Sequence, residues 1–96
     1  MVEFNIPGKL VLAPMAGVTD LAFREVCREQ GAAFAYTEMV SAKALIYQDK
    51  KTRELILSSP ADTPVAIQIF GSEPEIMAAA AAKAYSTTPC AAIDIN

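Results

Sequence analysis

The sequence predicts an α/β fold in which parallel strands alternate with helices. Short strand-like runs and helical patterns alternate along the chain in the order βαβαβαβ. The strand centres lie about 24 to 32 residues apart, which is the spacing of parallel strands joined by helical crossovers. Polar residues stand at the end of each strand, where α/β folds bind ligands. This pattern amounts to roughly half of a (β/α)8 barrel, although a small doubly wound sheet has the same periodicity.

The chain opens with a predicted strand and helix. Residues 10–13 form a short apolar run, and residues 19–30 show a helical pattern. Thr19 or Asp20 can accept the free N–H groups at the start of that helix, and Gly31 suits the left-handed conformation that ends one. We expect one face of the helix to carry Phe23, Val26, Cys27 and Gln30.

The middle of the chain contains two further strands around a weaker helical stretch. Residues 34–37 are a strand candidate, and residues 41–57 indicate two short helices with a break. Residues 65–70 are the clearest strand, because they are β-branched and aromatic and end at Gly71. The basic side chains of the helical stretch are expected to form a solvated face: Lys43, Lys50, Lys51 and Arg53.

The last helix and strand have clear signals. Ser72 and Glu75 have the spacing of a capping box, and Pro74 is typical of a first helical turn. Residues 90–95 form the fourth predicted strand. The helix is expected to pack through an apolar stripe: Ile76, Met77, Ala80, Ala81 and Ala84.

Composition limits the class of protein. A hydrophobic content of 53% and a net charge of −3 indicate a globular chain and give no sign of a nucleic-acid-binding surface. The start of the chain lacks signal-peptide features, and no apolar run is long enough to span a membrane, so we expect a cytoplasmic protein. With no histidine and no CxxC motif, Cys27 and Cys90 indicate neither a zinc site nor a disulfide framework. Both are expected to be small buried residues.

Gln68 is the most informative polar residue in a strand. It alternates with Ile67 and Ile69, so its amide should point into the interior of the fold, where it needs hydrogen-bond partners. A ligand edge with donors and acceptors would supply them, and so would neighbouring backbone or a buried water. On residue type alone, the second explanation is the commoner.

The other strand ends also carry candidate residues. Met15 lies on a tight turn, where it can belong to the core or lie against an aromatic ring. Glu38 follows a strand and is either a site acid or an exposed loop acid, the commoner case. Asp94 and Asn96 share one face of the last strand, where they could form a site or cap the following loop.

Four separated segments resemble the opening of the bacterial tRNA-dihydrouridine synthases. They are LAPMAGVTDLAFREVCREQGA, YTEMVSA, PVAIQIFGSEPEIMAAAA and AAIDIN, in the same order and spacing as in that family. The resemblance covers almost the whole chain. It implies the N-terminal half of a flavin-binding (β/α)8 (TIM) barrel over residues 1–96. It also implies an FMN-dependent enzyme that reduces uridine in tRNA to 5,6-dihydrouridine, with NADPH as the reductant.

The resemblance also assigns roles to particular residues. The turn formed by Pro14, Met15 and Ala16 would line the flavin, and Gln68 would bind its pyrimidine edge because an amide both donates and accepts. Asn96 would approach the substrate uridine, and Glu38 matches the acid of a TEM motif without an assigned role. In relatives, the catalytic cysteine follows shortly after the position of Asn96. The 96-residue chain is therefore expected to be inactive alone, with tRNA bound by other parts of a longer protein.

Two other functions fit these residues. Another FMN-dependent barrel, of the dihydroorotate or dihydropyrimidine dehydrogenase type, is a close enzymatic alternative with a poorer match to APMAGVTD and TEM. A non-catalytic module that self-associates through exposed strand edges is an alternative from a different class.

Overall fold

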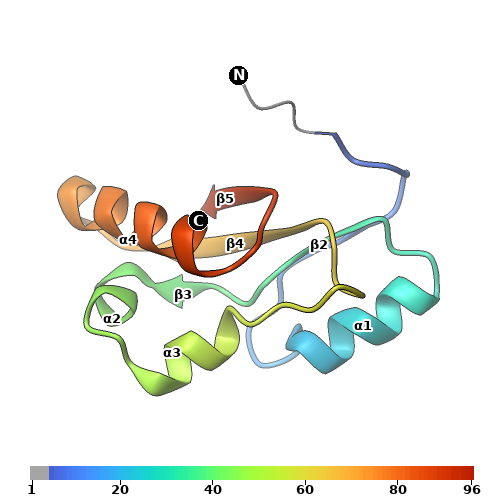
Figure 1. Cartoon of the computed structure of the whole chain (residues 1–96), viewed down its shortest axis with the longest axis horizontal. Helices are drawn as coiled ribbons and strands as arrows, with labels where there is room; N and C mark the ends of the chain where they lie inside the picture. The colour runs from blue at the N-terminus through green and yellow to red at the C-terminus, as the bar shows by residue number, and fades with distance from the viewer. Residues whose placement is uncertain (1–4) are drawn as a thin grey trace.

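The protein is built on one parallel sheet. The computed structural model describes residues 5–96, so residues 1–4 of the predicted domain lie outside the described part. The five strands of the sheet pair only in parallel (Figure 1). Their bounds are β1 Val11–Leu12, β2 Phe34–Tyr36, β3 Val40–Ser41, β4 Val65–Phe70 and β5 Ala92–Ile95.

The order of the strands distinguishes a barrel from a doubly wound sheet. β1 pairs with β2, β2 with β4, and β4 with β5, so the four predicted strands are neighbours in chain order. A doubly wound sheet reverses its strand order at a switch point, whereas consecutive barrel strands do not. The predicted α/β class and parallel order are confirmed, and the arrangement is that of part of a (β/α)8 barrel.

The unpredicted strand β3 continues the line of β2 after a bulge. Tyr36 pairs with Ala66 of β4, and Val40 pairs with Ile69. The step from Tyr36 to Val40 is one residue longer than the step from Ala66 to Ile69, so one extra residue is accommodated between β2 and β3. Such bulges are common beside functional sites.

The helices follow the predicted positions with one difference, at the N-terminus of α4. They are α1 Leu21–Glu29, α2 Ala42–Ile46, α3 Lys50–Leu55 and α4 Pro74–Thr87. Asp20, not Thr19, caps α1, since its carboxylate accepts from the Phe23 N–H at 2.8 Å. The predicted capping box of α4 does not form, because the N-cap is Glu73 and it makes no side-chain capping hydrogen bond. Pro74 does occupy the first turn, as predicted.

The main core lies between α2, α4 and β4. Ile67 and Ile69 of β4 are fully buried against Ala80 and Ala84 of α4, which confirms the predicted stripe on that helix. α2 and α4 pack against each other at one side of the molecule, while α1 lies at the other (Figure 1). Because side chains alternate along a strand, Gln68 points away from this core, toward the opposite face of β4.

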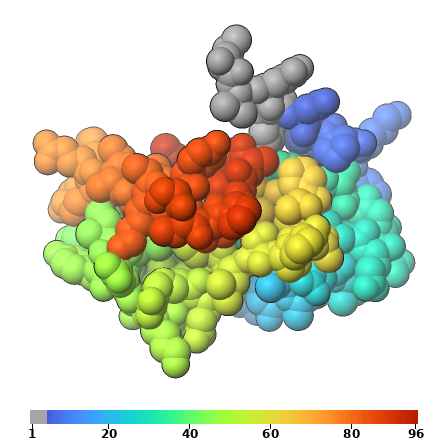
Figure 2. Space-filling view, viewed as in Figure 1, coloured from blue at the N-terminus to red at the C-terminus, as the bar shows by residue number. Residues whose placement is uncertain are grey.

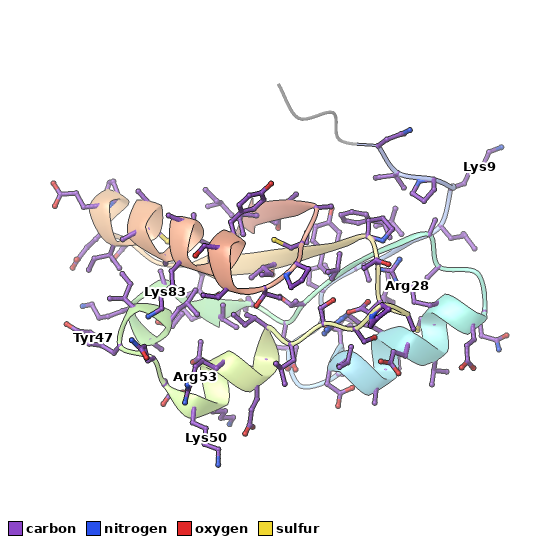
Figure 3. The ribbon with its side chains drawn as sticks, viewed as in Figure 1. Lys9, Arg28, Tyr47, Lys50, Arg53 and Lys83 are labelled. Carbon is purple, nitrogen blue, oxygen red and sulfur yellow. The ribbon has the colours of Figure 1, made fainter. Side chains whose placement is uncertain are left out.

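The basic residues of the middle stretch lie at the surface, as predicted. Lys43, Lys50, Lys51 and Arg53 are all exposed. Lys50 projects from α3 away from the sheet, as Figure 3 shows. This stretch therefore forms a solvated face rather than part of the sheet edge.

The expected apolar face of α1 is not the buried one. Phe23 is 38% exposed and Val26 is 57% exposed, while Arg24 is completely buried. Hydrophobic periodicity failed here because the buried position is occupied by a cation with its own partner. That partner is Asp62, 38 residues further along the chain.

Arg24 and Asp62 form the centre of a buried polar network. Arg24 Nε lies 2.8 Å from Asp62 Oδ2, and the other two guanidinium nitrogens donate to the carbonyls of Thr19 at 2.7 Å and Leu57 at 2.8 Å. Arg28 adds a second contact to Asp62 at 3.3 Å and donates to the Pro64 carbonyl. Arg28 is labelled in Figure 3, and Figure 2 shows the segment before β4 lying between α1 and α4. The network fastens α1 to this segment.

Removing the Asp62 carboxylate should be strongly destabilising. Asp62→Ala would leave Arg24 buried without its counter-ion, which typically costs about 3 to 5 kcal/mol. The free energy of unfolding in urea measures the effect. Asp49→Ala is the matched control, because Asp49 is exposed and only caps the short helix α3. Equal losses in the two variants would contradict a central role for the network.

Candidate functional site

The loop between β1 and α1 is a compact turn held by its own hydrogen bonds. The N–H groups of Val18 and Thr19 both donate to the Met15 carbonyl at 3.0 Å. The buried Thr19 hydroxyl also accepts from the Met15 N–H at 3.0 Å. Gly17 has a φ of 77°, a left-handed conformation that glycine adopts without strain. The turn presents Met15, 40% exposed, and the exposed Ala16 at the surface.

The bulge after β2 places Glu38 against this turn. Thr37 is fixed to β4, since its N–H donates to the Ala66 carbonyl at 2.9 Å and its hydroxyl accepts from the Gln68 N–H at 3.2 Å. Glu38 is only 8% exposed, and its Oε1 accepts a hydrogen bond from the Gly17 N–H. The structure therefore excludes the alternative of an exposed loop acid.

A chain of side-chain contacts crosses the ends of β4 and β5. Gln68 and Asp94 are register partners, and Gln68 Nε2 donates to Asp94 Oδ2 at 2.7 Å. Asn96 Nδ2 lies 3.5 Å from Gln68 Oε1 and 3.7 Å from Met39 Sδ. The Asn96 N–H donates to the Ile69 carbonyl at 3.0 Å, which extends the pairing of the two strands. Asp94 therefore orients Gln68 rather than capping a loop.

The predicted site residues gather at the carboxyl edge of the sheet in two groups. One group is the turn after β1, and the other is the amide pair on β4 and after β5. Among residues 5–96 the two groups share no direct hydrogen bond. They are linked through Glu38, which binds the turn, and its neighbour Met39, which touches Asn96. The residues concerned are Pro14, Met15, Ala16, Gln68 and Asn96.

Several residues that shape the site were missed by sequence reasoning. Thr19 was considered only as a helix cap, and Thr37 only as the end of a strand. The buried Arg24 guanidinium donates a hydrogen bond to the Thr19 carbonyl at the end of the turn. A charged residue inside an amphipathic helical pattern was the available signal, but its partner is too distant in sequence to be identified from one chain.

A cavity lies near this edge but on the helix side of the sheet. It has a volume of about 200 Å³ and is lined by residues that include Ser41, Lys43, Gly71 and Ile76. The candidate site residues are on the other face of β4, so this cavity is separate from them. Within residues 5–96, no group of three or more Cys, Asp or Glu side chains could hold a metal ion.

Cys90 lies at the opposite end of the sheet from the site. It precedes β5, next to the point where the Ala91 N–H donates to the Val65 carbonyl at the start of β4. Cys90 is half-buried rather than fully buried, and so is Cys27. Burial raises the pKa of the Cys90 thiol above its ordinary value. A thiol that resists ionisation at this end of the sheet is poorly suited to act at the candidate site.

One protein family matches most of the chain. A family model described as dihydrouridine synthase (Dus) matches residues 11–96, which include every strand-end motif. The chain belongs to this family. None of its helices within residues 5–96 has the length and apolar character needed to cross a membrane.

Individual dihydrouridine synthases are similar to the chain over most of its length. A probable tRNA-dihydrouridine synthase of Treponema pallidum is 41% identical over 92 residues, covering 96% of this chain and 27% of the relative. tRNA-dihydrouridine synthase B of Pseudomonas aeruginosa is 40% identical over 78 residues, covering 81% and 24%. The same enzyme of Pseudomonas putida is 37% identical over 94 residues, covering 98% and 28%. The chain spans about a quarter of the length of these curated relatives.

Proposed function

We propose that these residues belong to an FMN-dependent enzyme that reduces uridine in tRNA to 5,6-dihydrouridine, with NADPH as the reductant. The observation that carries the proposal is the match of the dihydrouridine synthase family over residues 11–96. The relatives are named as tRNA-dihydrouridine synthases, which supports tRNA as the substrate. The cytoplasm, where tRNA is available, is the proposed location.

The turn after β1 and Gln68 have properties that suit a flavin. Pro14, Met15 and Ala16 would line the ring, because the turn presents a polarizable thioether and a small side chain at the surface. Gln68 donates once to Asp94 and accepts once from Asn96, so its amide keeps a second N–H and a second lone pair for a ligand. Bound FMN would supply the hydride for the reduction.

Asn96 would contact a uracil ring beside that flavin. Its side chain is exposed, and its amide lies next to the amide of Gln68. Uracil presents N–H and C=O groups, and an asparagine amide can both donate to and accept from them. The side chain of Asn96 also contacts Met39 Sδ, which lies on the stretch after β2.

The net charge of the chain suggests that other parts of the enzyme bind most of the RNA. A net charge of −3 over the chain does not provide the excess of Lys and Arg that phosphate binding requires. We therefore assign most of the tRNA contacts to parts of the enzyme outside these residues.

Self-association of the 96-residue chain on its own is a second part of the proposal. β1 and β5 each have one paired neighbour among residues 5–96. Large apolar side chains on or beside these edge strands are exposed: Leu10, Val11, Phe23, Val26, Tyr85 and Ile95. A second copy is the available cover when the chain is alone, because unpaired edges and apolar surface favour association.

A full-length protein containing these residues should convert uridine to dihydrouridine in an unmodified tRNA transcript. Incubation with FMN and NADPH should consume NADPH in proportion to the dihydrouridine found by mass spectrometry of the digested RNA. Omitting the tRNA is the control. NADPH consumption that follows a free pyrimidine base and leaves the tRNA unchanged would favour an enzyme of the dihydroorotate or dihydropyrimidine type.

Gln68→Ala in the full-length protein should weaken FMN retention roughly ten-fold or more. The polar edge of the flavin would lose an amide partner at a position where an unpaired polar group typically costs about 1 to 3 kcal/mol. Flavin content after gel filtration and a fluorescence titration measure the effect. Gln30→Ala is the matched control, since Gln30 is exposed after α1. Unchanged flavin content in Gln68→Ala would count against the assigned role.

The 96-residue chain alone should form oligomers whose population rises with protein concentration. Size-exclusion chromatography with light scattering measures the mass, and Phe23→Ser with Val26→Ser should shift the population toward monomer. Lys50→Ser and Arg53→Ser on the solvated face are the controls. A chain that stays monomeric at all concentrations would rule out this part of the proposal.

A further inference from the structure

We propose that Glu38 is a positioning residue. Its carboxylate holds the Met15–Gly17 turn in the position, relative to β4, in which the turn can receive a flavin ring. The inference rests on the proposed function and gives a role to an acid that the family resemblance left unassigned. It depends on three features: how the backbone of Glu38 is fixed, what its carboxylate binds, and what else holds the turn.

The backbone at Glu38 is held rigidly to the central strand. The preceding Thr37 donates its N–H to the Ala66 carbonyl and accepts the Gln68 N–H on its hydroxyl. The same hydroxyl lies 2.9 Å from the Glu38 carbonyl, to which it donates. The bulge therefore does not leave Glu38 on a mobile loop. These hydrogen bonds tie the backbone beside Glu38 to β4, the strand that carries Gln68.

The carboxylate of Glu38 binds a backbone group and no cation. Its Oε1 accepts from the Gly17 N–H, and no Lys or Arg among residues 5–96 forms an ion pair with it. With an exposed fraction of only 8%, the Glu38 side chain has little contact with solvent. By contrast, the buried Asp62 has two arginine partners. Among residues 5–96, the Glu38 carboxylate is thus directed at the backbone of the β1–α1 turn and not at a counter-ion.

Within residues 5–96, Glu38 makes the only hydrogen bond between the Met15–Gly17 turn and the stretch that follows β2. The Thr19 hydroxyl and the Arg24 guanidinium hold the turn from the α1 side. Without Glu38, the turn would keep these contacts and the nearby pairing of β1 with β2, but it would lose its direct link to the stretch that follows β2. The distance between Met15 and Gln68 would then be poorly fixed, and both residues are assigned to the same flavin.

The test compares three variants of the full-length protein. Glu38→Ala removes the acceptor and should weaken FMN binding roughly ten- to hundred-fold, the range expected for a lost hydrogen bond to a charged group. Glu38→Gln keeps an acceptor oxygen of the same reach and should recover most of the affinity. Glu29→Ala removes an exposed acid of α1 and should bind like the wild type. Fluorescence quenching gives the affinities, and the resolution of the flavin absorption bands reports how firmly the ring is held.

Two further readouts separate this inference from a structural role and from the proposed function. Thermal unfolding of the FMN-free variants should change little, so a large loss of stability shared by Glu38→Ala and Glu38→Gln would overturn the positioning role. Wild-type affinity of Glu38→Ala for FMN would overturn it as well. If the wild type itself binds no FMN, the proposed function fails. The Gly17 amide signal in nitrogen-15 NMR then decides the contact, because Glu38→Ala should shift it upfield and speed its hydrogen exchange, and an unmoved signal overturns the inference.

Discussion

The buried pair of Arg24 and Asp62 is the interaction on which the arrangement of the chain depends. Burying two charges costs several kcal/mol for each ion unless their remaining hydrogen-bonding groups are satisfied. Here each of the three guanidinium nitrogens has an oxygen partner, and Asp62 receives a second arginine. These directional contacts fix α1, the segment before β4 and the end of the β1–α1 loop in one relative position. Apolar packing alone would not specify that geometry so tightly, because it is not directional.

The same pair connects the interior of the molecule to the candidate site. Arg24 holds the Thr19 carbonyl, and the Thr19 hydroxyl holds Met15, so a short series of hydrogen bonds runs from a buried carboxylate to an exposed methionine. On the opposite side, Glu38 links the turn to the central strand. The site residues are thus positioned by polar contacts, while the helix-covered face of the sheet is stabilised mainly by apolar contacts.

The sequence was sufficient for four of the five strands and insufficient for β3 and for the polar contacts between the strands. The run Val65–Phe70 and the spacing of its neighbours predicted the parallel order, because both signals are local. The burial of Arg24 could not be predicted, since it depends on an acid 38 residues away. Likewise, Gln68 was recognised as a buried amide, but its partner Asp94 is fixed only by the pairing of β4 with β5. The apparent capping box at Ser72 failed because α4 begins later, at Pro74.

The extra residue between β2 and β3 forms the bulge beside the candidate site. Side chains of a regular strand point alternately to the two faces of the sheet, and the bulge takes up one additional residue before that pairing resumes. Val40 is directed into the apolar core beside Ile69, and Ser41 is left to cap α2 through the Ala44 N–H. Deleting the extra residue would make the step from Tyr36 to the valine equal to the step from Ala66 to Ile69, so the valine would stay opposite Ile69. The deletion would instead remove the bulge from which Glu38 reaches the β1–α1 turn. Although it resembles a loop, this short stretch is therefore constrained both in its length and in the identity of Thr37 and Glu38.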